Sequence, residues 1–168
     1  MTSLRVENNQ QLEILRIPNM RSTLTIKDNQ YLKSANFPEL QMVGPSFVIS
    51  NNPSLKKING FPKLEQIDGS VDVTGTFSEF ELSKLNEIKG GINVQTKSKR
   101  FKCEEIYKLK NEDIIKGDTI ICLSGISDPK SIVLQPKSGI VIEKENKGTT
   151  NTSAAGTETL LNSDVVGL

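Results

Sequence analysis

One pattern recurs three times in the first third of the chain: an aliphatic residue, an Asn three positions later, and a Leu three positions after that. Successive Asn residues of the pattern are 20 and 23 residues apart. Repetition at this spacing predicts a solenoid, because a single coil cannot bury its own apolar side and must stack on neighbouring coils. The three copies are Val6-x-x-Asn9-x-x-Leu12, Ile26-x-x-Asn29-x-x-Leu32 and Ile49-x-x-Asn52-x-x-Leu55.

A second phrase follows at the same period. It places a Leu at positions 40, 64 and 85 and ends each time on a glycine, Gly44, Gly69 or Gly90. We expect these glycines to close each coil, through a positive φ or a close backbone approach. Between the phrases, apolar residues at alternate positions predict short strands with one face turned inward. The inward pairs are Leu4 and Val6, Leu24 and Ile26, Phe47 and Ile49, Val71 and Val73, and Ile92 and Val94.

Asn9, Asn29 and Asn52 occupy one register of the repeat. This favours a ladder of inward amides that bond to backbone groups left unpaired at each turn and to one another. The alternative is that Asn-Asn and Asn-Pro merely form good turns. The fourth coil departs from the pattern, because Thr76 stands in the matching place.

These patterns divide the chain into four regions. We expect a solenoid of about five coils over residues 1–100 and a cap with a short helix, residues 104–118, within residues 101–123. A stacked solenoid has an open apolar end that a cap must cover. Residues 124–143 are expected to be weakly ordered, with residues 131–134 and 139–142 pairing as a hairpin. Residues 144–168 are rich in Gly, Ser and Thr and are expected to form a disordered tail.

Composition excludes several kinds of function. The chain has no His, which removes the commonest general base and zinc ligand, and its two Cys are too few for a four-ligand zinc site. We expect no catalytic residue, no metal and no cofactor. Lys and Arg total 21 against 20 Asp and Glu, so no general attraction to nucleic acid is expected. The short basic run is interpreted as a solvated turn; it comprises Lys97, Lys99, Arg100 and Lys102.

The two cysteines, Cys103 and Cys122, flank the expected cap helix. In an oxidising compartment they would form a disulfide, whereas in a reducing one they would be two buried thiols. Asn151-Thr152-Ser153 is an N-glycosylation sequon in the expected tail. This sequon would be glycosylated only if the chain is secreted.

Outward positions of the expected strands define a candidate binding face, which alternation alone predicts to be flat and exposed. Among its acids, Asp72 would be the residue to test in a polysaccharide-active enzyme, the least favoured of the functions considered. The face comprises Lys27, Ser50, Asp72, Thr74, Asn93 and Gln95.

Several stretches resemble fungal cell-wall proteins of the extracellular-mutant and sporulation-specific type. The resemblance covers residues 4–123 and includes the cap phrase that runs from Phe101-Lys-Cys103 through Ile115-Lys-Gly-Asp118 to Cys122. The matching repeat phrases are Ile49-Ser-Asn-Asn-Pro-Ser-Leu55, Gly60-Phe-Pro-Lys-Leu64, Gly69-Ser-Val-Asp-Val-Thr-Gly75 and Lys89-Gly-Gly-Ile-Asn-Val94.

This resemblance implies a right-handed parallel β-helix like the receptor L domain, related to leucine-rich repeats, closed by a Cys103–Cys122 disulfide. It also implies a secreted, glycosylated, non-enzymatic protein that is fixed to the plasma membrane or wall by a glycosylphosphatidylinositol anchor. Such proteins support wall organisation or spore-wall assembly, and no catalytic residues come with the resemblance. The expected partners are wall polysaccharide or wall proteins, with a receptor-like binding module as the alternative.

The two ends of the sequence depart from this family. The chain starts in mid-pattern without a signal peptide, so we interpret it as a fragment or a shortened family member. Only Val165, Val166 and Leu168 follow the candidate attachment residues Asn162 and Ser163 as strong apolar residues. An anchor signal needs ~10 to 20 apolar residues there. Contact with a membrane is therefore expected only through a lipid anchor, which this sequence gives little sign of.

Overall fold

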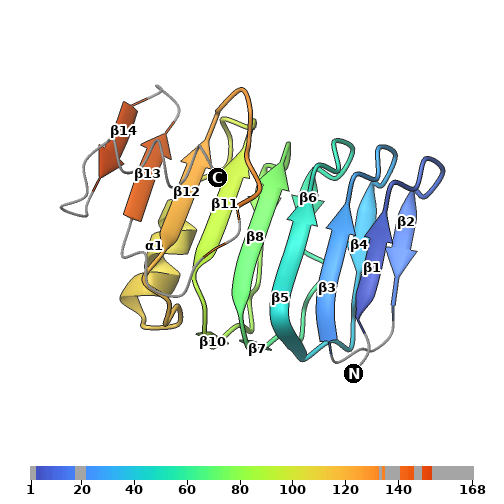
Figure 1. The fold of residues 1–168 in the computed structure, drawn as a ribbon, viewed down its shortest axis with the longest axis horizontal. Coiled ribbons are helices and arrows are strands. Elements are labelled where there is room, and N and C mark those ends of the chain that lie inside the picture. The colour runs from blue at the N-terminus through green and yellow to red at the C-terminus, as the bar shows by residue number, and fades with distance from the viewer. Residues whose placement is uncertain (1–2, 18–21, 133, 135–140, 146–148, 153–168) are drawn as a thin grey trace.

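The chain forms a parallel β-solenoid, as the repeat predicted. The computed structural model describes all residues except 1–2, 18–21, 133, 135–140, 146–148 and 153–168. Successive coils each add one strand to a main sheet, and these strands lie side by side along the long axis of the molecule (Figure 1). In order, the strands are β1 (Leu4–Glu7), β3 (Ser22–Lys27), β5 (Met42–Ser50), β8 (Ser70–Gly75), β11 (Ile92–Thr96) and β12 (Ile120–Ser124).

Shorter strands build the other walls of the coils. Two separate parallel pairs lie outside the main sheet, and two further short strands pair near the start of β5. Since every pair is parallel, equivalent residues of successive coils lie next to one another. The pairs are β2 (Ile14–Arg16) with β4 (Ser34–Asn36), β6 (Lys57–Ile58) with β9 (Glu79–Phe80), and β7 (Gln66–Ile67) with both β5 and β10 (Glu87–Ile88).

The predicted inward residues form a single core. From Leu24 onward each inward strand pair is at most 1% exposed, while Leu4 and Val6 of the first coil are only partly buried. The two Phe-Pro phrases also stack on one another: the rings of Phe37 and Phe61 are 5.1 Å apart and nearly parallel. Phe47 meets Phe61 edge to face at 5.2 Å. The repeat therefore specifies an aromatic column as well as an aliphatic one.

The glycines that close the coils act through close approach and not through positive φ. A Cβ at Gly69 would lie 1.8 Å from the carbonyl oxygen of Pro45, and one at Gly90 would lie 2.7 Å from the Gly69 backbone. Gly44 has ordinary contacts. The positive-φ turns fall instead on Asn8, Asp28 and Asn51, each directly before a ladder Asn. Short polar side chains tolerate this conformation better than others do.

The C-terminal part differs from the prediction in four ways. The cap helix is present but ends earlier than the expected residue 118, as α1 (Glu104–Asn111). The Cys103–Cys122 disulfide joins its start to β12, and β12 continues the main sheet in parallel. Beyond it, β13 (Val141–Glu145) pairs with β12 and with β14 (Thr149–Thr152).

Val141 and Ile142 thus pair with β12, and Ile142 also pairs with β14, where a hairpin with residues 131–134 was expected. Residues 144–145 and 149–152 are strand where a disordered tail was expected. The physical reason is the edge of β12, whose unpaired backbone groups accept a further strand. The rest of the expected tail, residues 153–168, and most of the expected hairpin loop lie outside the described residues.

Candidate functional site

The structure brings the three predicted ladder residues into direct contact. The backbone N–H of Asn29 and its side-chain Nδ2 both donate to Oδ1 of Asn52, at 3.0 and 3.1 Å. The backbone N–H of Asn9 donates to Oδ1 of Asn29 at 3.1 Å. Asn29 and Asn52 are buried, and each Nδ2 also donates to two backbone carbonyls. Asn9 is exposed. In the fourth coil the hydroxyl of Thr76 donates to the carbonyl of Pro53, so the ladder of Asn side chains ends at Asn52.

Replacing Asn52 by Ala is expected to lower the free energy of unfolding by about 2 kcal/mol. The change leaves the carbonyls of Ile26 and Ser50 and the N–H of Asn29 buried without these partners. Chemical denaturation of the purified chain measures it. Asn9→Ala is the matched control and should cost well under half as much, because Asn9 is exposed. Equal losses for the two variants would contradict a buried role for Asn52.

The predicted binding face is covered, contrary to expectation. Of its six residues only Lys27 is exposed; Ser50, Asp72, Thr74, Asn93 and Gln95 are at most 7% exposed. The segment that covers much of it, residues 126–132, is called the strap below. It begins after Gly125, whose φ of 68° turns the chain back from the end of β12. Figure 1 shows it in orange, passing in front of β11.

Side chains of the main sheet bind the backbone of the strap. Asn93 Nδ2 donates to the carbonyl of Lys130 at 3.0 Å, and the N–H of Lys130 donates to Gln95 Oε1 at 2.9 Å. The Asp72 carboxylate accepts from Asn93 Nδ2 at 2.7 Å, from the hydroxyl of Ser131 and from the N–H of Ile132 at 3.4 Å. These polar residues therefore satisfy backbone groups that the strap would otherwise leave unpaired.

An apolar contact completes the attachment of the strap. Ile121, on the outer face of β12, is fully buried and packs with Ile132, together with the partly buried Leu123 and Leu134. The sequence analysis missed this cover, although a signal for it exists. Residues 120–123 read Ile-Ile-Cys-Leu, a continuous apolar run, which is typical of a strand buried on both faces.

Burial raises the pKa of Asp72 above its ordinary value of 3.8, while hydrogen bonds from Ser131 and Asn93 act in the opposite direction. A raised pKa in the folded state gives stability that is fully present below the unfolded value and is lost as the pH rises through the folded value. The positive charge of Lys27 also lowers the pKa of Asp72, by less than these hydrogen bonds do.

Asp72→Asn should therefore gain stability relative to the parent chain as the pH rises from 3.8 to neutral. The measurement is the difference in free energy of unfolding between the two proteins along that pH range. Asp128→Asn is the control of opposite sign, and its effect falls below pH 3.8, because the hydrogen bond that Lys130 donates lowers the pKa of Asp128 and this stabilisation is lost as the pH falls through the lowered value. A difference that does not change with pH for Asp72→Asn would contradict the burial of a carboxylate at this position.

A polar cavity of about 320 Å³ lies where the strap meets the ends of β3, β5 and β8. Its lining combines the positive-φ residues Asp28 and Asn51 with Ser50, Thr74 and Thr76 of the sheet side and with residues 128–131 of the strap. Ser50 is 1% exposed, and its hydroxyl has no hydrogen-bond partner among the described residues.

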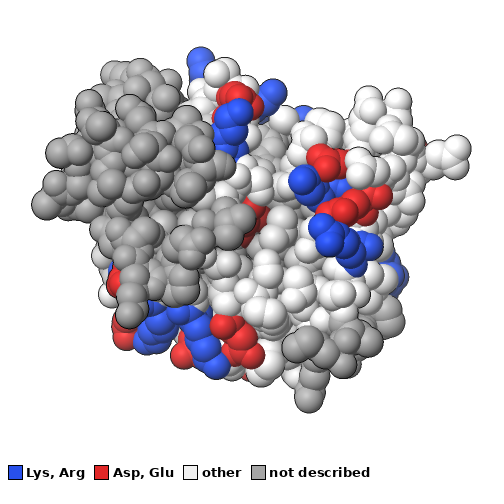
Figure 2. All heavy atoms as spheres, in the orientation of Figure 1, with Lys and Arg blue, Asp and Glu red and all other residues white. Residues whose placement is uncertain are grey.

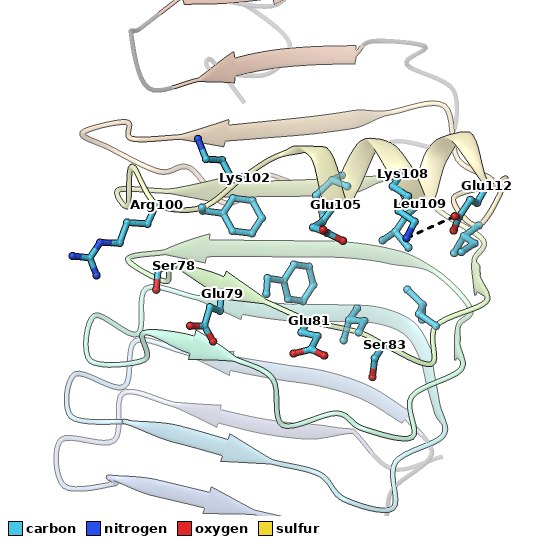
Figure 3. Close-up of a pocket in the computed structure, with 16 residues that line it drawn as sticks. Ser78, Glu79, Glu81, Ser83, Arg100, Lys102, Glu105, Lys108, Leu109 and Glu112 are labelled. Carbon is cyan, nitrogen blue, oxygen red and sulfur yellow. Dashed lines mark ion pairs between the residues drawn. The ribbon is translucent and has the colours of Figure 1, made fainter.

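A second hollow, a groove of about 630 Å³, separates α1 from the coil before it (Figure 3). It exists because a helix replaces the strand at this level and cannot pair with β9. Phe80, Phe101 and Leu109 contribute apolar surface to it. Its charged side chains come from both walls, with Glu79 and Glu81 on one and Glu105, Lys108 and Glu112 on the other, where Lys108 and Glu112 form an ion pair at 4.0 Å.

Charges on the surface are mixed. In the view of Figure 2, basic and acidic side chains lie next to one another in small groups, with uncharged surface between them. Some pairs join successive coils, such as Lys33 with Glu13 at 2.9 Å and Lys63 with Glu39 at 2.7 Å. Such exposed pairs contribute little stability.

The described part of the chain contains no group of three or more His, Cys, Asp or Glu side chains placed to hold a metal ion. It also has no helix of the length and apolarity needed to cross a membrane. The predicted glycosylation residue Asn151 lies in β14 opposite Glu143.

The chain is similar to fungal proteins that are named as sporulation-specific, cell surface GPI-anchored and cell wall proteins. The chain is 35% identical over 116 residues to sporulation-specific protein 2 of Saccharomyces cerevisiae, an alignment that covers 68% of this chain and 23% of the yeast protein. It is 34% identical over 116 residues to a cell surface GPI-anchored protein of Arthroderma benhamiae, covering 68% of the chain and 30% of that protein. The identity to cell wall mannoprotein PST1 of S. cerevisiae is also 34% over 116 residues, covering 69% and 26%.

No family model matches the chain, and no solved structure matches it. The chain spans less than a third of the length of the relatives named above. This chain belongs to the fungal protein family that includes sporulation-specific protein 2 and cell wall mannoprotein PST1 of S. cerevisiae.

Proposed function

We propose that this chain is part of a secreted, non-enzymatic glycoprotein of the fungal cell wall or outer cell surface, and that it contributes to wall organisation. The observation that supports it most is the relationship over 116 residues to proteins named as cell wall, cell surface GPI-anchored and sporulation-specific. None of these names denotes an enzyme. The disulfide between Cys103 and Cys122 agrees with an oxidising, extracellular setting.

The architecture suits such a role. A stack of parallel coils is a stiff unit whose lateral surfaces repeat at a fixed spacing, so it can display side chains and glycans at regular intervals. Asp72, the acid that an enzyme on this sheet would have used, is buried and bonded to Asn93, Ser131 and Ile132. In this proposal the Asp72 carboxylate holds the strap against the main sheet.

Deletion of the gene in its source organism tests the role. We expect cells without it to become sensitive to wall-binding dyes, with resistance restored by the parent sequence and by Gly75→Ala, where a Cβ has room. Gly69→Ala, where a Cβ would lie 1.8 Å from a carbonyl oxygen, should not restore it. Normal dye resistance in the deleted strain, or recovery of the protein outside the wall and surface fractions, would overturn the proposal.

The enzymatic alternative has a direct assay. Purified protein is incubated with β-glucan and chitin, and released reducing sugar is measured. We expect none above the level of a heat-denatured sample. Release that disappears in Asp72→Asn would replace the structural role with a catalytic one.

A further inference from the structure

The segment that leads from β11 to α1, residues 97–102, is called the basic turn here, and we propose that it binds an anionic polysaccharide. It contains Lys97, Lys99, Arg100 and Lys102, all of which are exposed. The inference rests on the proposed wall role for the choice of a polysaccharide, and it extends that role by naming a site and the charge of its ligand. The sequence alone indicated a solvated turn, and the structure adds three features that favour a ligand.

The first feature is positive charge without a counter-charge. Nine basic side chains elsewhere in the described chain form ion pairs with acids, whereas none of the four in the basic turn pairs with an acid among the described residues. The two acids that follow in the sequence, Glu104 and Glu105, begin α1. Figure 3 shows Glu105 directed into the α1 groove, while Arg100 and Lys102 point away from it. Like charges this close repel one another, so an anion that contacts two or more of them is favoured.

Acids of the adjacent strap and coil are already paired with other lysines. Asp128 of the strap, on which Lys97 acts, pairs with Lys130 at 2.6 Å. Glu79 of the preceding coil pairs with Lys57 at 2.8 Å. The charge of the basic turn is therefore not cancelled by these two neighbours.

The positive surface continues from the basic turn toward the preceding coils. Lys56 Nζ contacts Thr76 Oγ1 at 3.0 Å, and Thr76 lines the polar cavity together with Lys97. The lining of that cavity holds three lysines and two aspartates, and each aspartate has one lysine as its partner. Lys97 is thus the uncompensated charge of the cavity, and Lys56 adds a further cation beside it.

The second feature is a fixed backbone. The hydroxyl of Thr96 donates to the carbonyl of Phe77 at 2.6 Å and accepts from the N–H of Ser98 at 3.1 Å. The hydroxyl of Ser98 accepts from the N–H of Arg100 at 3.2 Å, and its carbonyl accepts from the N–H of Gly125 at 3.1 Å. The backbone of the turn is therefore held in place before any ligand arrives, which lowers the entropy cost of binding.

The third feature is the lack of exposed apolar side chains within residues 97–102. Phe101 is 4% exposed and packs edge to face with Phe77 at 5.4 Å, and the other residues of the turn are Ser98 and the four cations. Protein interfaces usually centre on aromatic anchors, and single-stranded nucleic acid stacks on exposed rings. A hydrated polyanion needs neither. Phosphate and carboxylate groups both accept hydrogen bonds from Lys and Arg, so the shared requirement is repeated negative charge on the polysaccharide.

The test is a titration of the full 168-residue chain with three forms of one mannan. The first form is unmodified, the second carries phosphate groups and the third carries carboxylate groups, so the three differ only in charge. We expect at least one charged form to bind at about 0.05 M salt and to be released at about 0.5 M salt, because exposed charges are screened there. The charged form that binds more tightly identifies the anion.

The double variant Lys99→Gln with Arg100→Gln should weaken this binding about tenfold, the scale of two exposed ion pairs. Arg16→Gln with Lys84→Gln is the matched control. It also removes one Arg and one Lys that are exposed and have no ion pair among the described residues, and it lies outside the basic turn, so it should leave the affinity unaltered.

Four results would each overturn the inference. They are equal weakening by the two double variants, equally tight binding of the unmodified mannan, no binding of any mannan at low salt, and tighter binding to poly-glutamate, which would point to an acidic protein instead. The dye test of the deleted strain uses neither double variant, so the wall role is judged separately and survives the loss of this site.

Discussion

Gly69→Ala is expected to lower the free energy of unfolding by about 3 kcal/mol, among the largest effects of any single methyl in this chain. The added Cβ would lie 1.8 Å from the carbonyl oxygen of Pro45 and 2.4 Å from its carbonyl carbon. These are backbone atoms, so no side-chain rotation relieves the overlap. The two coils must separate locally, which also disturbs the pairing of β5 with β8 that starts one residue later, at Ser70.

The matched control is Gly75→Ala at the other end of the same strand. Its Cβ would meet only a side-chain carbon of Phe77, at 3.8 Å, so we expect a change within about 0.5 kcal/mol. Equilibrium denaturation of both variants by guanidinium, followed by far-UV circular dichroism, measures the difference. Similar stability for Gly69→Ala and the parent chain would mean that the coils are not stacked as closely here as the structure has them.

Removal of the disulfide, by replacing Cys103 and Cys122 with Ala together, is expected to cost about 3 kcal/mol. The bond closes a loop between residues 19 apart, and in the chain-entropy model a loop of this length restricts the unfolded chain by about that amount. Both cysteines are fully buried, so lost packing adds to the effect. The loop contains α1, whose buried residue is Ile106.

Hydrogen exchange locates this loss. Amides of residues 104–117 should lose protection in the double variant, while those of β3, β5 and β8 should keep theirs, because solenoid coils depend mainly on their neighbours. The parent chain unfolded, reduced and refolded in reductant serves as the comparison that has lost the bond but kept both sulfur atoms. A double variant with the stability of the oxidised parent would show that the bond contributes nothing measurable.

The sequence predicted the solenoid because its information is local and repeated. Alternation at Leu24 and Ile26 is ambiguous in one copy, but the same alternation at Phe47 and Ile49 and again at Val71 and Val73 admits one stacking. Asn29 and Asn52 occupy the same position of the repeat, which places the two amides next to each other in a parallel stack, where the structure has them bonded. Each of these features follows from the period and the register of the repeat, which can be read directly from the amino-acid sequence.

The candidate binding face could not be judged in the same way. The alternation of apolar residues correctly predicted that the side chains of Asp72, Asn93 and Gln95 point away from the core. It gives no information on what covers the outer face of the sheet. Their side chains turned out to bind Lys130, Ser131 and Ile132, contacts that span 35 to 60 residues of sequence. Such long-range contacts of a non-repeating segment leave no periodic trace, and only the apolar outer position of Ile121 hinted at them.

The sequence by itself determined the stacked coils, the inward aliphatics and the register of the Asn residues, since each coil meets neighbours of nearly the same composition and the pattern has one self-consistent packing. Tertiary structure alone decided that the strap folds over the main sheet, that β12 extends the sheet instead of closing it, and that a polar cavity forms beside Ser50. These depend on where a unique segment finds unpaired backbone and apolar surface, and that is fixed only once the sheet exists.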